Sequence, residues 1–280
     1  MNAPASKVRL APGGGGGWLG GPRTSSSDNY SATPAGLTHG VIPNSDGSER
    51  QATGTSIFDP VLCELAYRWF CPKGGMVADP FAGGSVRGIV AAALGYNYIG
   101  FELRAEQVEA NREQAARILK GPLFPEWITG DSAVQMPAWG GSADMVFSCP
   151  PYGNLEVYSD APDDLSAMTD DDFSAAYRVI IAAAVAKLKP DRFACFVVGN
   201  YRDKKGFYVD LVGQTVAAFE AAGARYYNEA VLVTAVGSLP IRVGQQFRAA
   251  RKLGKTHQNV LVFCKGDPKR ATQAIKDVEQ

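Results

Sequence analysis

The chain lacks an excess of charge of either sign, because 28 Lys and Arg residues balance 28 Asp and Glu residues. Overall charge therefore does not predict binding to nucleic acid or to any other highly charged partner. Basic residues instead gather near the C-terminus: residues 241–280 hold nine Lys or Arg against three acids. A local cluster of this kind can neutralise backbone phosphates.

Cysteines are few and lack the paired spacing of metal ligands. There are five of them, an odd number: Cys63, Cys71, Cys149, Cys195 and Cys264. We expect no metal site, and we expect buried thiols typical of a reducing compartment. The sequence also has no apolar run of about 18 residues and no secretory leader, so it predicts a cytoplasmic protein that neither spans a membrane nor binds one.

Residues 1–54 have few aliphatic side chains and include five consecutive glycines at 13–17. Such a composition cannot bury enough apolar surface to order itself. We predict a flexible Gly/Ser-rich extension over 1–54, one catalytic domain over 55–266 and a solvated tail over 267–280.

The domain alternates between strand-like and helix-like segments. Apolar periodicity predicts strands near 76–79, 97–101, 126–129, 143–148 and 192–198, with helices over 60–70, 85–94, 104–119, 171–188 and 207–222. This alternation is typical of βαβ units and a mainly parallel, Rossmann-like α/β sheet. Two final strands, near 226–234 and 258–264, have no helix expected between them and predict an antiparallel hairpin.

A rigid corner ends the fourth strand. Residues 146–152 read Val-Phe-Ser-Cys-Pro-Pro-Tyr, and the two prolines must stop the strand. In an open α/β sheet, the carboxyl edge is where ligands bind. An aromatic ring beside short polar side chains could hold a flat substrate such as a nucleobase, whereas a plain Pro-Pro turn with a core tyrosine is the structural alternative.

Three acids stand at the ends of successive strands. Asp79 precedes the glycine pair Gly83–Gly84 at a strand-to-helix turn, Glu102 follows 23 positions later, and Asp131 ends the third strand. Glycines let a ligand approach the backbone, and an acid about 20 residues further on suits a ribose diol.

This combination resembles the S-adenosylmethionine-dependent DNA amino-methyltransferases, whose motifs are Asp-Pro-Phe-x-Gly-x-Gly and (Asp/Asn/Ser)-Pro-Pro-(Tyr/Phe). The resemblance covers roughly residues 55–265 and includes the segment Ser56–Pro60 and the last strand. It implies a seven-stranded sheet ending in an antiparallel hairpin, S-adenosylmethionine as cofactor, and transfer to N6 of adenine or N4 of cytosine in DNA after base flipping. Without an apparent nuclease motif, we expect a phage or solitary enzyme rather than a fused restriction-modification protein.

The resemblance also implies roles for individual residues. In the cofactor site it places Asp79, Pro80, Phe81, Ala82, Gly83, Glu102, Asp131 and Ser132. Glu102 would accept hydrogen bonds from the ribose hydroxyls, and Asp131 would accept one from the adenine amino group. Asp79 and the loop backbone would hold the methionyl part. The catalytic corner comprises Ser148, Cys149, Pro150, Pro151 and Tyr152, with the Pro150 carbonyl accepting from the target amine and Tyr152 stacking on the base.

Two departures from the family pattern matter. Ser85 replaces the third glycine, and Cys149 stands where the family has Asp, Asn or Ser. A thiol is a weak acceptor, so Ser148 could compensate. Cys149 also leaves open methylation at carbon 5 of cytosine, which needs a thiolate nucleophile. A nucleic-acid-binding module with a vestigial methyltransferase fold is a further alternative.

We predict target recognition in an insertion over 235–257, because long loops in compact domains are usually functional. Gln side chains can read adenine, and Lys and Arg can contact phosphates. The candidate DNA-binding residues are Arg242, Gln245, Gln246, Arg248, Arg251, Lys252 and Lys255. A second, acidic insertion over 153–170 is a solvated loop or, in a sharper interpretation, a mobile lid.

Overall fold

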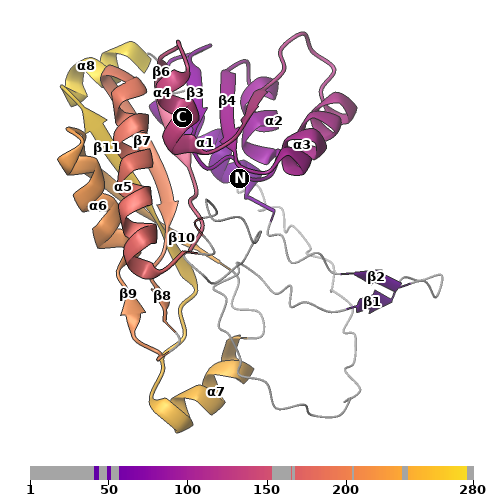
Figure 1. Cartoon of the computed structure of the whole chain (residues 1–280), viewed down its shortest axis with the longest axis vertical. Helices are drawn as coiled ribbons and strands as arrows, with labels where there is room; N and C mark the ends of the chain where they lie inside the picture. The colour runs from indigo at the N-terminus through magenta and orange to yellow at the C-terminus, as the bar shows by residue number, and fades with distance from the viewer. Residues whose placement is uncertain are drawn as a thin grey trace, which may run out of the picture.

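The computed structural model describes residues 41–43, 49–51, 57–152, 165, 168–203, 205–234 and 239–275. Its centre is a seven-stranded sheet in the order β10-β11-β7-β6-β3-β4-β5 (Figure 1). The strands are β3 (Met76–Asp79), β4 (Asn97–Glu102), β5 (Glu126–Thr129), β6 (Ala143–Ser148), β7 (Leu188–Val198), β10 (Arg225–Val233) and β11 (His257–Lys265). The predicted strands and their order along the chain are confirmed.

Strand direction is mixed, as predicted. β3 through β7 pair in parallel, whereas β11 runs antiparallel to both β7 and β10. The parallel strands therefore end at one edge of the sheet, the carboxyl edge, and β11 begins there. The corner that follows Ser148 and the loop that follows Asp79 lie side by side at this edge, because β3 and β6 are neighbours.

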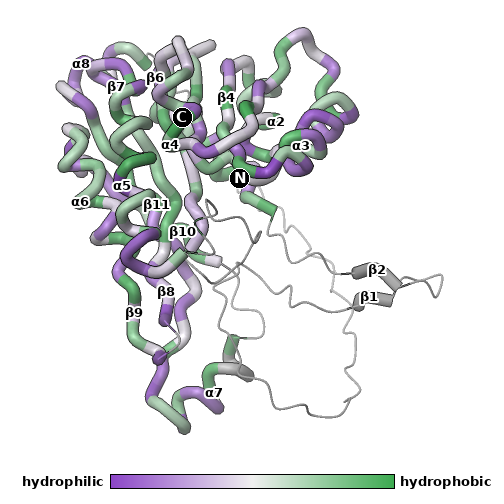
Figure 2. The backbone as a smooth tube through the Cα atoms, viewed as in Figure 1, coloured by the Kyte–Doolittle hydropathy of each residue, from purple (hydrophilic) through white to green (hydrophobic). Residues whose placement is uncertain are grey.

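Helices cover both faces of the sheet. One face packs against α1 (Pro60–Phe70), α2 (Val86–Ala93), α3 (Ala105–Ile118) and α8 (Pro268–Ile275), and the other against α4 (Ser132–Ala138), α5 (Asp170–Lys187) and α6 (Leu211–Ala221). Each face has its own buried cluster, with Tyr67 and Phe147 in one and Phe196 and Phe219 in the other. Figure 2 shows hydrophilic stretches on the outer helix α3 and around β8 and α7.

The start of α1 shows how local sequence sets an element boundary. Asp59 accepts a hydrogen bond from the backbone N–H of Val61 at 2.8 Å, and Pro60 occupies the first helical turn, where it needs no donor. The apolar side of α1 then buries Cys63, Ala66 and Tyr67 against the sheet.

Two segments differ from the sequence-based expectation. The insertion expected to lack structure contains helix α7 (Leu239–Ala250). The segment expected to be a solvated tail contains α8, whose Ala271 and Ile275 are buried against the sheet. Both helices are short, and each contains a proline in its first turn, Pro240 in α7 and Pro268 in α8.

Two small sheets complete the described part. β1 (Val41–Pro43) and β2 (Glu49–Gln51) pair antiparallel within the expected extension, and β8 (Tyr201–Arg202) and β9 (Tyr208–Val209) form a hairpin directly after β7. The acidic insertion lies almost wholly outside the described residues. Among the residues that the structure describes, no helix combines the length and apolar character needed to cross a bilayer.

Candidate active site

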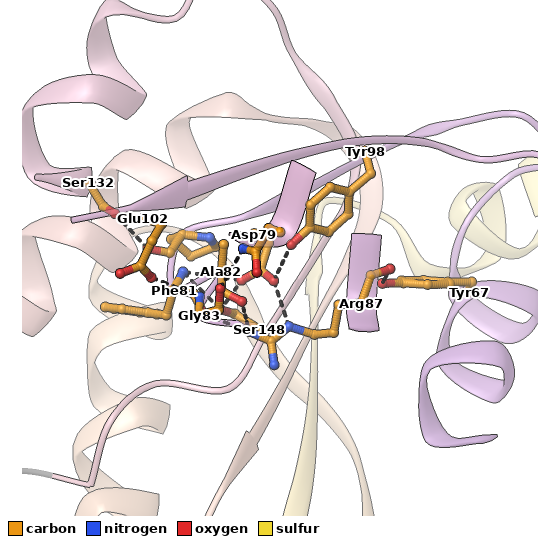
Figure 3. Close-up of polar contacts among 12 residues, drawn as sticks. Tyr67, Asp79, Phe81, Ala82, Gly83, Arg87, Tyr98, Glu102, Ser132 and Ser148 are labelled. Carbon is orange, nitrogen blue, oxygen red and sulfur yellow. Dashed lines mark hydrogen bonds and ion pairs between the residues drawn. The ribbon is translucent and has the colours of Figure 1, made fainter. Parts of the chain in front are cut away.

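Asp79 lies at the centre of a buried polar network behind the glycine loop (Figure 3). One carboxylate oxygen accepts from the Phe81 N–H at 3.1 Å and from the Ser148 hydroxyl at 2.5 Å. The other accepts from Arg87 Nε at 2.6 Å and from the Tyr98 hydroxyl at 2.8 Å. With its side chain fully buried and both oxygens accepting hydrogen bonds, Asp79 shapes the loop. The role predicted for Asp79 and the loop backbone in holding the methionyl part stays a prediction.

Arg87 is the partner of Asp79 that the sequence interpretation missed. Its guanidinium pairs with Asp79 and also donates to the carbonyls of Phe81, at 2.6 Å, and Ala82, at 2.9 Å. Burial would lower the pKa of Arg87, but the Asp79 carboxylate outweighs burial and raises it, so the guanidinium stays charged. The available signal was an arginine inside the apolar helical segment Val86–Ala93, where a buried charge requires a partner.

Further side chains fix the loop from other directions. The Ser132 hydroxyl donates to the Pro80 carbonyl at 2.6 Å, and Asn111 donates to the Gly83 carbonyl at 2.7 Å. Ser132 and Asn111 are both buried. Ser132 therefore supports the loop from behind, and Asn111, in α3, was not among the predicted residues.

The glycine loop presents open backbone to the carboxyl edge. Gly83 adopts φ +49°, which favours glycine, and a Cβ placed on Gly83 or Gly84 would meet no atom within 4 Å. A ligand could thus approach the main chain closely. This open surface, set beside a strand-end acid, fits an adenosyl cofactor.

Glu102 is the acid that faces this loop. Its carboxylate accepts from the Gly83 N–H at 2.9 Å and from the Arg104 N–H at 3.1 Å. Burial raises the pKa of Glu102, although the Arg104 N–H and guanidinium and the Gly83 N–H counteract it. The side chain keeps 13% of its surface exposed, so Glu102 is both tied to the loop and accessible to a ligand.

Asp131 lies at the start of α4 and performs a capping role. One carboxylate oxygen accepts from the Ala133 N–H at 2.8 Å, in the geometry of a helix N-cap. One of its two carboxylate oxygens is thus engaged in capping the helix. Its predicted contact with the adenine amino group stays a prediction.

Ser148 and Cys149 have different surroundings. Ser148 is fully buried, and its hydroxyl donates to Asp79 and accepts from the Phe81 N–H at 3.1 Å. The idea that Ser148 compensates for Cys149 as an acceptor does not fit this burial. Cys149 is half-buried, whereas the other four cysteines are buried as expected. Burial raises the pKa of Cys195, for example, to about 12.

Tyr152 is held at the corner by the first residues of β11. Its hydroxyl accepts a hydrogen bond from Gln258 Nε2, a contact between segments far apart in the sequence. Burial, and next the neighbouring Cys149, hold the pKa of Tyr152 well above its ordinary value, so its hydroxyl stays neutral. Pro150 is buried and Pro151 is half-buried, which makes the corner a rigid part of the sheet edge.

The predicted DNA-binding residues lie apart from the sheet, in α7 and just after it (Figure 1). Gln245, Arg248 and Arg251 are exposed, and Gln246, Lys252 and Lys255 are half-buried. Arg251 lies over the Phe247 ring, 5.0 Å from its centroid. Arg242 falls within α7, but its side chain is outside the described part.

Comparison with known proteins gives one family match and many similar folds. An N6/N4 methyltransferase family, described as DNA methylase, matches residues 58–113. That range holds the glycine loop, Arg87 and Glu102. No curated protein matches the sequence.

Among solved structures, TrmN from Thermus thermophilus is 17% identical with a TM-score of 0.50, over 74% of this chain and 49% of TrmN. The chain thus spans about half the length of TrmN. A TehB-like S-adenosylmethionine-dependent methyltransferase from Corynebacterium glutamicum is 16% identical (TM-score 0.46, 76% and 91% covered). Magnesium protoporphyrin IX methyltransferase from Synechocystis, with bound S-adenosylmethionine, is 12% identical (TM-score 0.46, 74% and 76% covered).

These findings confirm the predicted fold, a seven-stranded methyltransferase sheet with an antiparallel end. The family match over residues 58–113 agrees with the predicted class, an S-adenosylmethionine-dependent methyltransferase, and with its cofactor.

Proposed function

We propose that this protein transfers a methyl group from S-adenosylmethionine to the exocyclic amine of adenine (N6) or cytosine (N4) in DNA, after the target base has left the duplex. The observation that carries the proposal is the buried hydrogen bond between Ser148 and Asp79, at 2.5 Å. It fixes the Cys-Pro-Pro-Tyr corner directly beside the open glycine loop, and methyl transfer requires donor and acceptor sites in contact.

The cofactor, when bound, supplies an electrophilic methyl group. In this chain the open backbone at Gly83 and Gly84 and the carboxylate of Glu102 would hold it. Arg87, Ser132 and Asn111 act behind the loop, because each holds a loop carbonyl in place. The loop is thus organised before any ligand binds.

The corner provides the means to hold a base and its amine. An exocyclic amine is a poor nucleophile because its lone pair is delocalised into the ring, so an acceptor for its hydrogens is needed. Because the Ser148 hydroxyl already donates to Asp79 and accepts from the Phe81 N–H, the Pro150 carbonyl is the acceptor that we assign, assisted weakly by Cys149. The Tyr152 ring, fixed through its hydroxyl by Gln258, would stack on the flipped base.

The choice of DNA rests on the family match over residues 58–113 and on the basic surface around α7. Residues 239–257 contain five Lys or Arg and no acid. A surface of this kind suits a phosphate backbone. A duplex whose target base enters the corner would have its backbone at the carboxyl edge, beside α7.

One observation favours a second candidate, methylation at carbon 5 of cytosine. Cys149 is the half-buried cysteine among the five, and it lies in the corner itself. Its thiolate would add to carbon 6 and make carbon 5 nucleophilic; after methyl transfer, loss of the carbon-5 proton would expel the thiolate.

A tritiated-methyl transfer assay on DNA, RNA and protein, followed by mass analysis of the nucleosides, tests the proposal. We expect N6-methyladenine or N4-methylcytosine in DNA. Cys149→Ser should keep activity, since a hydroxyl accepts from the amine better than a thiol, and Tyr152→Phe should keep far more activity than Tyr152→Ala. A covalent complex with DNA containing 5-fluorocytosine, together with an inactive Cys149→Ser that still binds cofactor, would establish carbon-5 chemistry instead. Weak or absent binding of S-adenosylmethionine would favour a non-catalytic module.

A further inference from the structure

The hairpin of β8 and β9 follows β7 at the carboxyl edge, the same edge as the catalytic corner. Its turn is well organised. The Asp203 carboxylate accepts from the Phe207 N–H at 2.8 Å, and the Asp203 N–H donates to the Phe207 carbonyl, also at 2.8 Å. Arg202 donates to the carbonyl of Gly206 at 2.8 Å. Gly206, at φ +93°, provides the backbone conformation that this turn requires.

This hairpin exposes two adjacent aromatic rings. Phe207 is 71% exposed and Tyr208 is 50% exposed, and the Arg202 guanidinium lies 4.0 Å from the centroid of the Tyr208 ring. A single exposed apolar side chain is ordinary. Two exposed rings at consecutive positions of a hydrogen-bonded turn, one of them already stacked on a cation, instead offer aromatic faces on which another flat group could stack.

The charge of the hairpin matches that of α7. Residues 200–209 contain three Lys or Arg, and the acid at the turn, Asp203, is engaged by the Phe207 N–H. Together with residues 239–257, the two segments hold eight basic residues against one acid, Asp203. Such a density of positive charge fits a polyanion.

The hairpin is also in contact with the segment that follows α7. Lys252 packs against the turn so closely that a Cβ on Gly206 would lie 2.8 Å from its ammonium nitrogen. Lys255 donates to the carbonyl of Asn200, just before β8, at 3.5 Å. The hairpin and residues 251–257 are therefore joined, and α7 lies beyond β8 and β9, away from the central sheet (Figure 1).

We propose that the β8–β9 hairpin is a second DNA-contacting element, in which Phe207 stacks on an unstacked base next to the target and Lys205 contacts the phosphates of the same strand. The inference rests on the proposed function and deepens it, because it assigns DNA contacts to a segment outside the predicted recognition insertion. Unstacked bases arise at such a site because the target nucleotide has to leave the duplex.

The test is fluorescence anisotropy with fluorescein-labelled DNA, either single-stranded or a duplex with one abasic site, which mimics a site whose base has been extruded. Phe207→Ala should weaken binding by about fivefold or more, and Phe207→Trp should restore it, because stacking needs the ring and not its identity. Lys205→Glu should lower the salt dependence of binding by about one counterion.

Two matched controls lie at the opposite edge of the sheet. Phe124→Ala removes another exposed ring, before β5, and Lys269→Glu reverses another exposed charge, in α8. Neither should change DNA affinity. Thermal unfolding and cofactor binding of each variant show that the fold is intact.

The outcomes separate the two proposals. If the wild-type protein binds and methylates DNA but Phe207→Ala behaves like Phe124→Ala, the hairpin proposal is wrong and the proposed function stands. If the wild-type protein neither binds nor methylates DNA, the proposed function fails first. If Phe207→Ala weakens the binding of RNA of the same length but not the binding of DNA, both the hairpin proposal and the proposed function are wrong.

Discussion

At the residue scale, Glu102 combines two tasks that impose opposite demands. It must be buried enough to fix the Gly83 N–H and exposed enough to accept from a ligand. The structure meets both, since the carboxylate makes two backbone hydrogen bonds and retains an accessible side. Burial raises its pKa, so its protonation is sensitive to mildly acidic conditions.

This arrangement predicts a pH-dependent cofactor affinity. The carboxylate accepts hydroxyl donors, so affinity for S-adenosylmethionine should fall as pH falls toward the raised pKa of Glu102, at a higher pH than for an ordinary glutamate. Glu102→Ala should cost about 2 kcal/mol or more of binding, and Glu102→Gln should bind weakly with little pH dependence between pH 5 and 8. Calorimetric titration measures both. Glu106→Gln, at an exposed position in the first turn of α3, serves as control, and equal pH profiles for Glu102→Gln and wild type would contradict the assignment.

At the element scale, Asp144 joins three strands at the amino edge of the sheet. Its carboxylate accepts from the Met76 N–H at the start of β3 at 3.1 Å, and from Lys189 at 2.8 Å and Arg192 at 3.3 Å, both in β7. Burial alone would raise its pKa, but hydrogen bonds from Lys189, Met76 and Arg192 outweigh burial and lower it.

We therefore expect Asp144→Asn to reduce the free energy of unfolding by roughly 1 kcal/mol, a modest value because Lys189 is partly exposed and screened. The lowered pKa means that the carboxylate stabilises the fold fully above about pH 3.9, the value of an unfolded aspartate, and that this contribution is lost as pH falls through the folded-state pKa. Urea unfolding from pH 7 to pH 3 checks both points. As a control, Glu113→Gln, which breaks an exposed helical ion pair with Arg117, should leave the free energy of unfolding almost unchanged. If the difference in stability between Asp144→Asn and wild type already shrinks near pH 5, the lowered pKa of Asp144 is not its cause.

At the scale of the whole molecule, one group of basic residues lies apart from the central sheet. The basic residues of α7 and its C-terminal segment extend from the carboxyl edge, where the site lies (Figure 1). Reversing Arg248 and Arg251 to Glu should therefore weaken DNA binding and reduce the slope of log K against log salt by about 1.8, if both contact phosphates. Reversing Lys73 and Lys269, exposed at the amino edge, should leave the slope unchanged. If the two double variants have the same slope, α7 is not the DNA surface.

The sheet and the position of its site could be predicted from the sequence because both follow from local patterns. Short apolar strands that alternate with helices indicate a parallel sheet, and Asp79, Glu102 and Ser148 stand at the ends of three of these strands, hence at one edge. The contacts within that edge could not be predicted in the same way. The hydrogen bond of Ser148 to Asp79 joins residues 69 positions apart, and that of Gln258 to Tyr152 spans 106. Helix α7 contains Pro240 and Gly244, two residues of low helix propensity, which favoured a loop in the sequence-based prediction.

The hydrogen bond between Ser148 and Asp79 has a consequence for the order in which ligands bind. Because Ser148 holds Asp79 and the Phe81 N–H at once, a displacement of the cofactor loop is transmitted to the corner, and a displacement of the corner to the loop. A ligand at the loop and a ligand at the corner would therefore be thermodynamically linked. For the proposed pair, the factor by which DNA changes the affinity for cofactor would equal the factor by which cofactor changes the affinity for DNA.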